Sequence, residues 1–222
     1  MKRSILLILS FIVMSSSAFA GSGDVRVTAF AGHNASYGMF GGAETAAFYD
    51  FSSSWQFRGA VRYSSYYMGT ADLRPAFIYD LEVGRLRVEA IAQYSRLTST
   101  NNICAGVAAS LHAKRMWFSA GYCYRMFSAE GSRLCEPVNL LYELGFSFLP
   151  DVDRWDLNFI ISNSRLARIE RAFQPSFILE CEFSPSDNFG VIMSVDAMRA
   201  GIFNIASVHY QSLLSIGVRH RW

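Results

Sequence analysis

The chain has 222 residues, of which 51% are hydrophobic, 15% are aromatic and only 17% are charged. A chain of this composition is too apolar to be disordered, and its length favours a single domain. The net charge is +2 and the sequence contains no long run of Lys or Arg, which argues against a nucleic-acid partner.

The N-terminus has the pattern of a secretory signal peptide. A Lys-Arg pair follows Met1, the apolar stretch SILLILSFIVM comes next, and Ala18 and Ala20 supply the small-x-small cleavage pattern. The apolar stretch is short for a helix that spans a bilayer. We therefore predict a signal peptide over residues 1–20, with an uncleaved N-terminal anchor as the alternative, and a mature protein of residues 21–222.

Apolar and polar residues alternate through nearly the whole mature chain, which is the spacing of β-strands. In WQFRGAVRY, for example, Trp55 and Phe57 lie on one face and Arg58 lies on the other. Turn-like stretches divide this pattern into twelve predicted strands, at 24–34, 42–51, 55–66, 74–82, 85–97, 103–112, 115–127, 138–148, 154–163, 174–183, 188–199 and 205–222. Ten strands is the alternative, because three of the signals are weak, and eight strands would need more loop than the sequence contains.

Three structures compete for the stretch ICAGVAASLHAKRMWFSAGYCYRMF: a buried helix, a membrane helix and a pair of strands. Its apolar residues recur at every second position on both sides of Ala113 and Lys114, so we predict a β-hairpin with a two-residue turn there. In this register Cys104 lies opposite Cys123, at a separation that allows a disulfide in an oxidising compartment. Adjacent-strand geometry often strains such a bridge, which favours a reduced pair, with the disulfide as the alternative.

Two classes of β protein have one apolar and one charged face. In a soluble sheet the apolar face points inward, whereas in an outer-membrane barrel it meets lipid and the charged face lines the lumen. Aromatic residues near the strand ends, a polar face rich in Gly, Ala and Ser, and a single lysine after residue 20 favour the barrel. The connections after even-numbered strands are short and most of the others are longer, as in such barrels.

The sequence resembles bacterial outer-membrane β-barrel proteins over about the whole mature chain. The final strand carries the alternating, aromatic-ended pattern that the barrel assembly machinery reads in that class, although His220 departs from it; the matching residues are Leu214, Ile216, Val218 and Trp222. The resemblance implies an outer-membrane location, with membrane lipid, the assembly machinery and periplasmic chaperones as partners. It implies neither a cofactor nor a metal, and it does not identify a function.

The charged residues of the polar face are the candidate lumen-lining set. They are Glu44, Arg58, Arg62, Asp80, Arg87, Glu89, Arg125, Glu143, Glu180, Glu182, Asp196 and Arg219, with Arg26 and Asp156 as further candidates. The predicted registers place Asp80 opposite Arg87, Glu82 opposite Arg85 and Glu44 opposite Arg62. Such a lumen is either a small pore for polar solutes or a barrel held shut by internal ion pairs, which would act as a structural or adhesive protein through its outer loops.

Three further features bear on function. The stretch SRLARIERAFQ is predicted to be an outer loop, either solvated or forming a short helix with a basic face that could bind a partner. Cys135 is expected in another outer loop and Cys181 on the lipid face. A hydrolase at the outer rim is a third hypothesis, since His33 and His209 could meet across the barrel closure, but no catalytic motif accompanies them.

Overall fold

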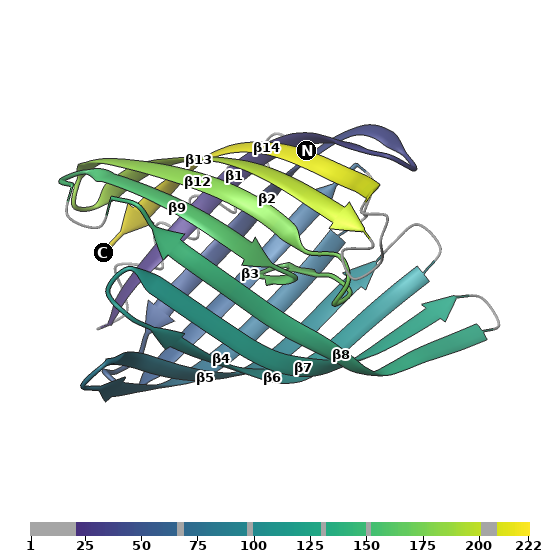
Figure 1. Cartoon of the computed structure of the whole chain (residues 1–222), viewed down its shortest axis with the longest axis horizontal. Coiled ribbons are helices and arrows are strands. Elements are labelled where there is room, and N and C mark those ends of the chain that lie inside the picture. The colour runs from purple at the N-terminus through teal and green to yellow at the C-terminus, as the bar shows by residue number, and fades with distance from the viewer. Residues whose placement is uncertain (1–20, 66–68, 97–99, 130–131, 150–151, 201–207) are drawn as a thin grey trace.

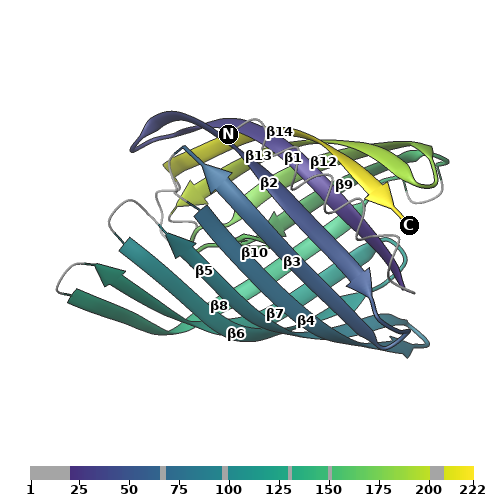
Figure 2. The same ribbon diagram turned by 180° about the vertical axis from the view of Figure 1, so that it is seen from behind.

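Twelve antiparallel strands close into one barrel in the computed structural model of the chain (Figures 1 and 2). The structure describes residues 21–65, 69–96, 100–129, 132–149, 152–200 and 208–222. The predicted signal peptide over residues 1–20 lies outside these ranges. Each strand pairs with the next one along the chain, and the first pairs with the last to close the ring. The prediction of an all-β barrel with twelve strands is thereby confirmed.

Seven of the twelve barrel strands are longer than the sequence pattern indicated, mostly at the ends that carry the longer loops, whereas β3, β9 and β14 are shorter. Their bounds are β1 Ser22–Asn34, β2 Gly38–Asp50, β3 Trp55–Ser64, β4 Gly69–Leu81, β5 Gly84–Arg96, β6 Thr100–His112, β7 Met116–Ala129, β8 Ser132–Ser147, β9 Trp155–Ser162, β12 Ser176–Ser186, β13 Phe189–Ala200 and β14 Val208–Arg221. A separate two-stranded sheet, β10 Ser164–Arg165 and β11 Arg168–Ile169, lies between β9 and β12 in the chain. Cys135, expected in a loop, therefore lies on β8.

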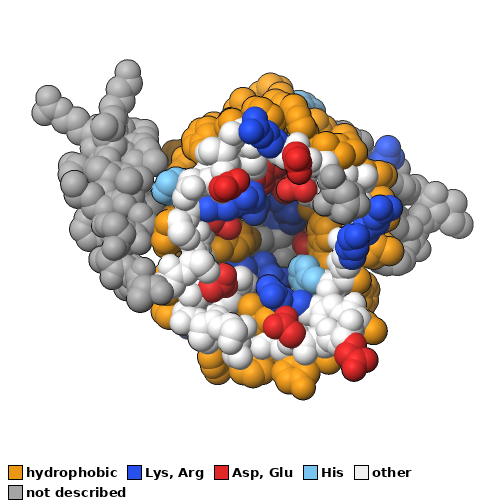
Figure 3. Space-filling model, turned by 90° about the vertical axis from the view of Figure 1, so that its left-hand side faces the viewer, with side chains coloured by type: hydrophobic (Ala, Val, Ile, Leu, Met, Phe, Trp, Pro, Cys, Tyr) orange, Lys and Arg blue, Asp and Glu red, His pale blue; other side chains and the backbone are white. Residues whose placement is uncertain are grey.

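The outer surface of the barrel is apolar and the interior is charged. Along β4, for example, Leu73, Phe77 and Tyr79 are exposed, whereas Asp72 and Arg74 are buried inside. Figure 3 shows one end of the barrel, with hydrophobic side chains around the outside and charged side chains around a central hollow. A closed ring leaves no unpaired strand edge, and an apolar exterior matches lipid, so the outer-membrane barrel is the class that fits.

The described ranges contain no helix that is long and apolar enough to cross a bilayer.

Two predicted hairpin registers are wrong because each turn lies one residue away from the predicted position. Between β6 and β7 the turn is centred on Lys114 and Arg115, so that Cys104 lies opposite Arg125 and not opposite Cys123. Both charged residues are thereby placed in the exposed turn. The two cysteines become diagonal neighbours, a separation that is long for a disulfide, and both are free.

The turn between β4 and β5 is displaced in the same way. Asp80 pairs with Arg85, and not with Arg87, because the turn consists of Glu82 and Val83. Gly84 is needed in the strand, since a side chain there would meet the carbonyl oxygen of a residue in the neighbouring strand β6 at 2.2 Å. The third predicted pair, Glu44 with Arg62, is confirmed and forms an ion pair of 3.1 Å.

A tryptophan inside the barrel covers a glycine of the adjacent strand. Trp117 on β7 lies opposite Gly145 on β8, and its indole Nε1 donates to Glu143 Oε1 at 2.8 Å. A Cβ added at Gly145 would lie 1.9 Å from the indole ring, which is impossible without a shift of that ring.

We expect Gly145→Ala to lower the free energy of unfolding by about 1–3 kcal/mol, because the extra carbon displaces Trp117 and breaks its bond to Glu143. Urea unfolding of the protein in lipid vesicles, followed by tryptophan fluorescence, measures this change. Gly69→Ala is the control, since a Cβ at Gly69 meets nothing closer than 3.9 Å. Equal unfolding midpoints for both variants would contradict the expectation.

Candidate functional site

The chain between β9 and β12 folds into the barrel instead of forming an outer loop. This inner segment, residues 163–174, contains the small hairpin of β10 and β11, and Figure 2 shows β10 within the barrel outline. Ala167 at its tip has a positive φ of 58° and is 3% exposed. The prediction of an outer loop with a solvated or partner-binding basic face is therefore wrong.

Apolar contacts hold the inner segment at two separate places on the lumen wall. Ile169 is 4% exposed and belongs to a cluster with residues of β5 to β8, namely Ile91, Cys104, Ala108, Cys123 and Leu141. Ala167 and Leu166 pack against Ala46, Phe48 and Ala60 on β2 and β3. Full burial of one aliphatic side chain contributes about 1.5–3 kcal/mol, so these contacts favour the inward position.

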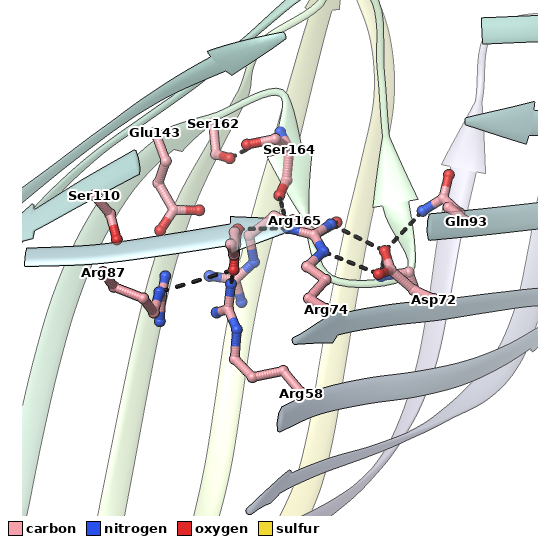
Figure 4. A network of polar contacts seen from close by, with 12 residues as sticks. Arg58, Asp72, Arg74, Arg87, Gln93, Ser110, Glu143, Ser162, Ser164 and Arg165 are labelled. Atoms are coloured by element: carbon pink, nitrogen blue, oxygen red, sulfur yellow. Dashed lines mark hydrogen bonds and ion pairs between the residues drawn. The ribbon is translucent and has the colours of Figure 1, made fainter. Parts of the chain in front are cut away.

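A buried ion pair on β4 binds the backbone of the inner segment. Arg74 donates to the carbonyl oxygens of Ser164 and Arg165, both at 3.0 Å, and to both carboxylate oxygens of Asp72 at 2.9 Å. Asp72 is fully buried and also accepts the backbone N–H of Ala167 at 3.0 Å. Figure 4 shows Arg74 between Asp72 and the inner segment, with Gln93 on the far side of the carboxylate.

The side chains of the inner segment reach the other wall of the barrel. Arg165 forms an ion pair of 3.0 Å with Glu180 on β12, and Arg168 pairs with Asp196 on β13. On a third side, Asn139 of β8 donates to the carbonyl oxygen of Glu170 at 3.0 Å. The inner segment is thus bonded to strands on several sides of the lumen.

The inner segment lies between two cavities. The larger one measures about 320 Å³ and is lined by residues near the short turns, including His112 and Trp117. The smaller one measures about 270 Å³ and lies on the side of the longer loops. Arg62 of β3 and Arg168 of β11 line both cavities, so these two arginines lie where the cavities adjoin.

Arginine outnumbers carboxylate around both cavities. Seven arginines and five carboxylates line the larger cavity, and four arginines and one carboxylate line the smaller one. Most of the carboxylates are paired, whereas several buried guanidinium nitrogens, among them Nε of Arg58, Arg87 and Arg125, have no hydrogen-bond partner within the described ranges. The surroundings therefore favour negatively charged or polar solutes over cations.

Most of the candidate lumen residues lie around these cavities. Glu44, Arg58, Arg62, Arg87, Glu89, Glu143, Glu180, Asp196 and Arg26 line the larger cavity, and Arg125 lines the smaller one. Glu182 and Arg219 are buried and paired with each other, outside both linings. Asp80 and Asp156 are exposed, and Asp80 forms its ion pair with Arg85 at a turn.

The outward-facing candidates lie apart from the lumen. Leu214, Ile216 and Val218 are exposed on the outer face of β14, and Trp222 follows the end of that strand.

His33 is exposed and lies opposite Ser212 in the β1–β14 register, so this pair also faces away from the lumen. The side chain of His209, the other candidate for a hydrolase, lies outside the described part. Within the described part, no three His, Cys, Asp or Glu residues lie together as metal ligands would.

Sequence reasoning missed the residues that position the inner segment. Asp72 lies before the predicted strand at 74–82 and is therefore not among the predicted lumen residues. Pro75 lies inside β4, where it interrupts the hydrogen-bonded ladder without ending the strand. The sequence does contain an indication that Ile169 is buried. Apolar residues alternate with the arginines of SRLARIERAFQ, and a loop that meets only solvent does not require them.

Sequence comparisons identify no relative of the chain: no protein-family model matches it, and no curated protein matches it. Solved structures do resemble it. The KdgM porin in complex with disordered oligogalacturonate is 8% identical, with a TM-score of 0.58 over 90% of this chain and 99% of that chain. The NanC porin is 10% identical, with a TM-score of 0.58 over 90% and 100% of the two chains.

A third similar structure is the translocator domain of the autotransporter NalP from Neisseria meningitidis. It is 11% identical, with a TM-score of 0.53 over 100% of this chain and 97% of that domain. At such identities the likeness concerns the fold, and it confirms the outer-membrane β-barrel that the sequence pattern predicted. The two porins belong to a class of channels and not of enzymes.

We expect Asp72→Ala to release the inner segment, because the substitution removes the acceptor of Ala167 N–H and leaves the buried Arg74 with only Glu89, at 3.5 Å, as an opposite charge within ion-pair distance in the described ranges. Hydrogen–deuterium exchange of backbone amides in residues 163–174 should become at least about tenfold faster, while exchange in the barrel strands away from β4 stays slow. Asp80→Ala is the control, since its ion pair with Arg85 is exposed. Unchanged exchange in the Asp72 variant would show that the pair does not hold the segment.

Proposed function

We propose that the chain is a narrow outer-membrane pore for small solutes, constricted by the inner segment and selective for anions over cations. The observation that carries this proposal is a pair of cavities, one on each side of the inner segment, whose linings share Arg62 and Arg168. The proposed passage runs between these two arginines. A barrel of this strand number falls between eight strands, which side chains fill, and sixteen, which leave an open channel. An inner segment that occupies part of the lumen therefore suits a channel for small solutes.

The charges along this path support a preference for anions. Arg62 is paired with Glu44 and its guanidinium also lies 4.0 Å from the ring centroid of Phe30, so its position is fixed. The excess of arginine over carboxylate continues on both sides of the passage. Fixed positive charge along a narrow path lowers the barrier for anions and raises it for cations.

The likeness to porins supports the same proposal at the level of fold. A barrel closed by its internal ion pairs, acting through its outer loops, remains the competing function. The two differ in one measurable property, because only a pore conducts ions. Conductance of the refolded protein in planar bilayers is therefore the deciding experiment.

The targeting of the protein completes the proposal. We infer that residues 1–20 direct export and are removed after Ala20, and that the final strand is read by the barrel assembly machinery with the help of periplasmic chaperones. Leu214, Ile216 and Val218 on the lipid face of β14 supply the alternating apolar pattern. An in vivo pulse-chase of processing and membrane insertion tests both steps.

Shortening the inner segment should raise the conductance severalfold. Ser162 and Ser176 are partners in the β9–β12 register, so replacement of residues 164–174 by Gly-Ser-Gly rejoins the two strands without a gap. Single-channel recording in potassium chloride measures the change. A silent wild type with a conducting variant would favour the closed barrel, and silence from both would contradict the pore.

Neutralising the passage should reduce the preference for anions. We expect Arg62→Gln to shift the reversal potential in a salt gradient towards that of an unselective pore, because one fixed positive charge is lost from the proposed passage. Arg85→Gln is the control, since that side chain is 62% exposed at a turn. Equal shifts in the two variants would argue against selectivity at Arg62.

A further inference from the structure

The larger cavity has two unlike walls. Arg58, Arg74 and Arg87 line it from β3, β4 and β5. Ile160, Ile178 and Ile192 line it from β9, β12 and β13. In the closed ring these two sets of strands lie directly across from one another, six strands apart in either direction. A solute in this cavity therefore contacts guanidinium groups on one side and aliphatic side chains on the other.

The arginine wall has binding capacity that the protein does not use. Arg58, Arg74 and Arg87 all lie within ion-pair distance of one carboxylate, that of Glu89, and Arg74 is also bound by Asp72. Arg87 Nε lies 3.8 Å from Glu89, too far for a hydrogen bond. The Nε atoms of Arg58 and Arg87 are buried and have no hydrogen-bond partner within the described ranges. Figure 4 shows Arg58 and Arg87 on one side of the network, with Glu143 beyond Arg87.

The carboxylates of the opposite wall are already occupied. Glu180 is paired with Arg165 and Asp196 is paired with Arg168, both from the inner segment. Their charges are thus compensated, and the other cavity-lining residues of these three strands are the isoleucines, which are 2–6% exposed, with Asn158 and Ser194. Glu143 accepts a hydrogen bond from the Trp117 indole, which adds an aromatic ring to the lining.

We propose that the larger cavity is a binding site for a small organic anion with an apolar body, such as an aromatic or branched-chain carboxylate. This inference rests on the proposed pore and names the class of solute that its larger cavity takes. The carboxylate of the solute binds Arg58 and Arg87, and its apolar body lies against Ile160, Ile178 and Ile192. A cavity of about 320 Å³ is at the lower end of the range for small-molecule sites, which suits a solute of this size.

Three probes separate the two parts of the site. Benzoate has both an anionic group and an apolar body, acetate has mainly the anionic group, and benzyl alcohol has the apolar body without charge. Isothermal titration calorimetry with the refolded mature protein in detergent should give the tightest binding for benzoate. Equal affinities for benzoate and acetate would overturn the role of the isoleucine wall, and equal affinities for benzoate and benzyl alcohol would overturn that of the arginines.

Two substitutions locate the site. Arg87→Gln should weaken benzoate binding by about tenfold, since a hydrogen bond to a charged group is lost, whereas Arg85→Gln at the exposed turn should leave it unchanged. Ile192→Thr should weaken benzoate binding by about fourfold and leave acetate binding unaffected, because it replaces an apolar ethyl group with a hydroxyl and leaves the charge of the site unchanged. Ile216→Thr, on the outer face of the barrel, is the matched control. If Arg87→Gln and Ile192→Thr both bind benzoate with the affinity of the wild type, benzoate binds elsewhere and the proposed site is wrong.

Current recordings distinguish failure of this inference from failure of the pore. If the protein conducts but benzoate neither binds more tightly than acetate nor reduces the chloride current, the solute class is wrong and the pore stands. If benzoate binds as expected but no conductance appears, the site is real and the barrel is a closed binding protein.

Discussion

The buried pair of Asp72 and Arg74 is the interaction on which the interior arrangement depends. A fully buried carboxylate is costly unless each oxygen has partners, and here they come from Arg74, Gln93 and the backbone of Ala167. Arg74 in turn uses its remaining donors on two carbonyl oxygens of the inner segment. The same few atoms therefore satisfy the wall of β4 and position the segment that divides the lumen. Neither part reaches its full hydrogen-bond complement without the other.

Period-two alternation was sufficient to predict the barrel, because lipid outside and charge inside impose a different chemistry on successive residues of every strand. The hairpin registers were harder to predict. Between β4 and β5, Val83-Gly84 and Glu82-Val83 are both acceptable two-residue turns, and only the need for Gly84 in the strand distinguishes them. The inner segment was missed for another reason. Its arginines look like those of a solvated loop, and their partners Glu180 and Asp196 are recognisable only when distant strands are brought together. Pairing across a lumen leaves no local pattern in the sequence.

The alternation of apolar and polar residues also failed to indicate which apolar residues face the interior. Ile160, Ile178 and Ile192 occur in runs such as FII, FIL and VIM, where both faces of the strand are apolar and the inward residue has no contrast with its neighbours. The structure resolves these runs into outward residues for the membrane and inward residues for the lumen wall. The interior is consequently divided between one side dominated by arginine and another that contains aliphatic surface. A lumen lined uniformly by charge would bind all small anions with similar affinity. A lumen with one arginine wall and one aliphatic wall distinguishes anions by their uncharged part.

The attachment of the inner segment has a consequence for how such a protein can evolve. The segment leaves β9 at Ser162 and returns at Ser176, two positions that are already neighbours in the sheet. Insertions, deletions and substitutions between them change what fills the lumen without altering strand number, tilt or the surface that meets lipid. Selection on transport can therefore act on a dozen residues while selection on folding acts on the rest of the wall.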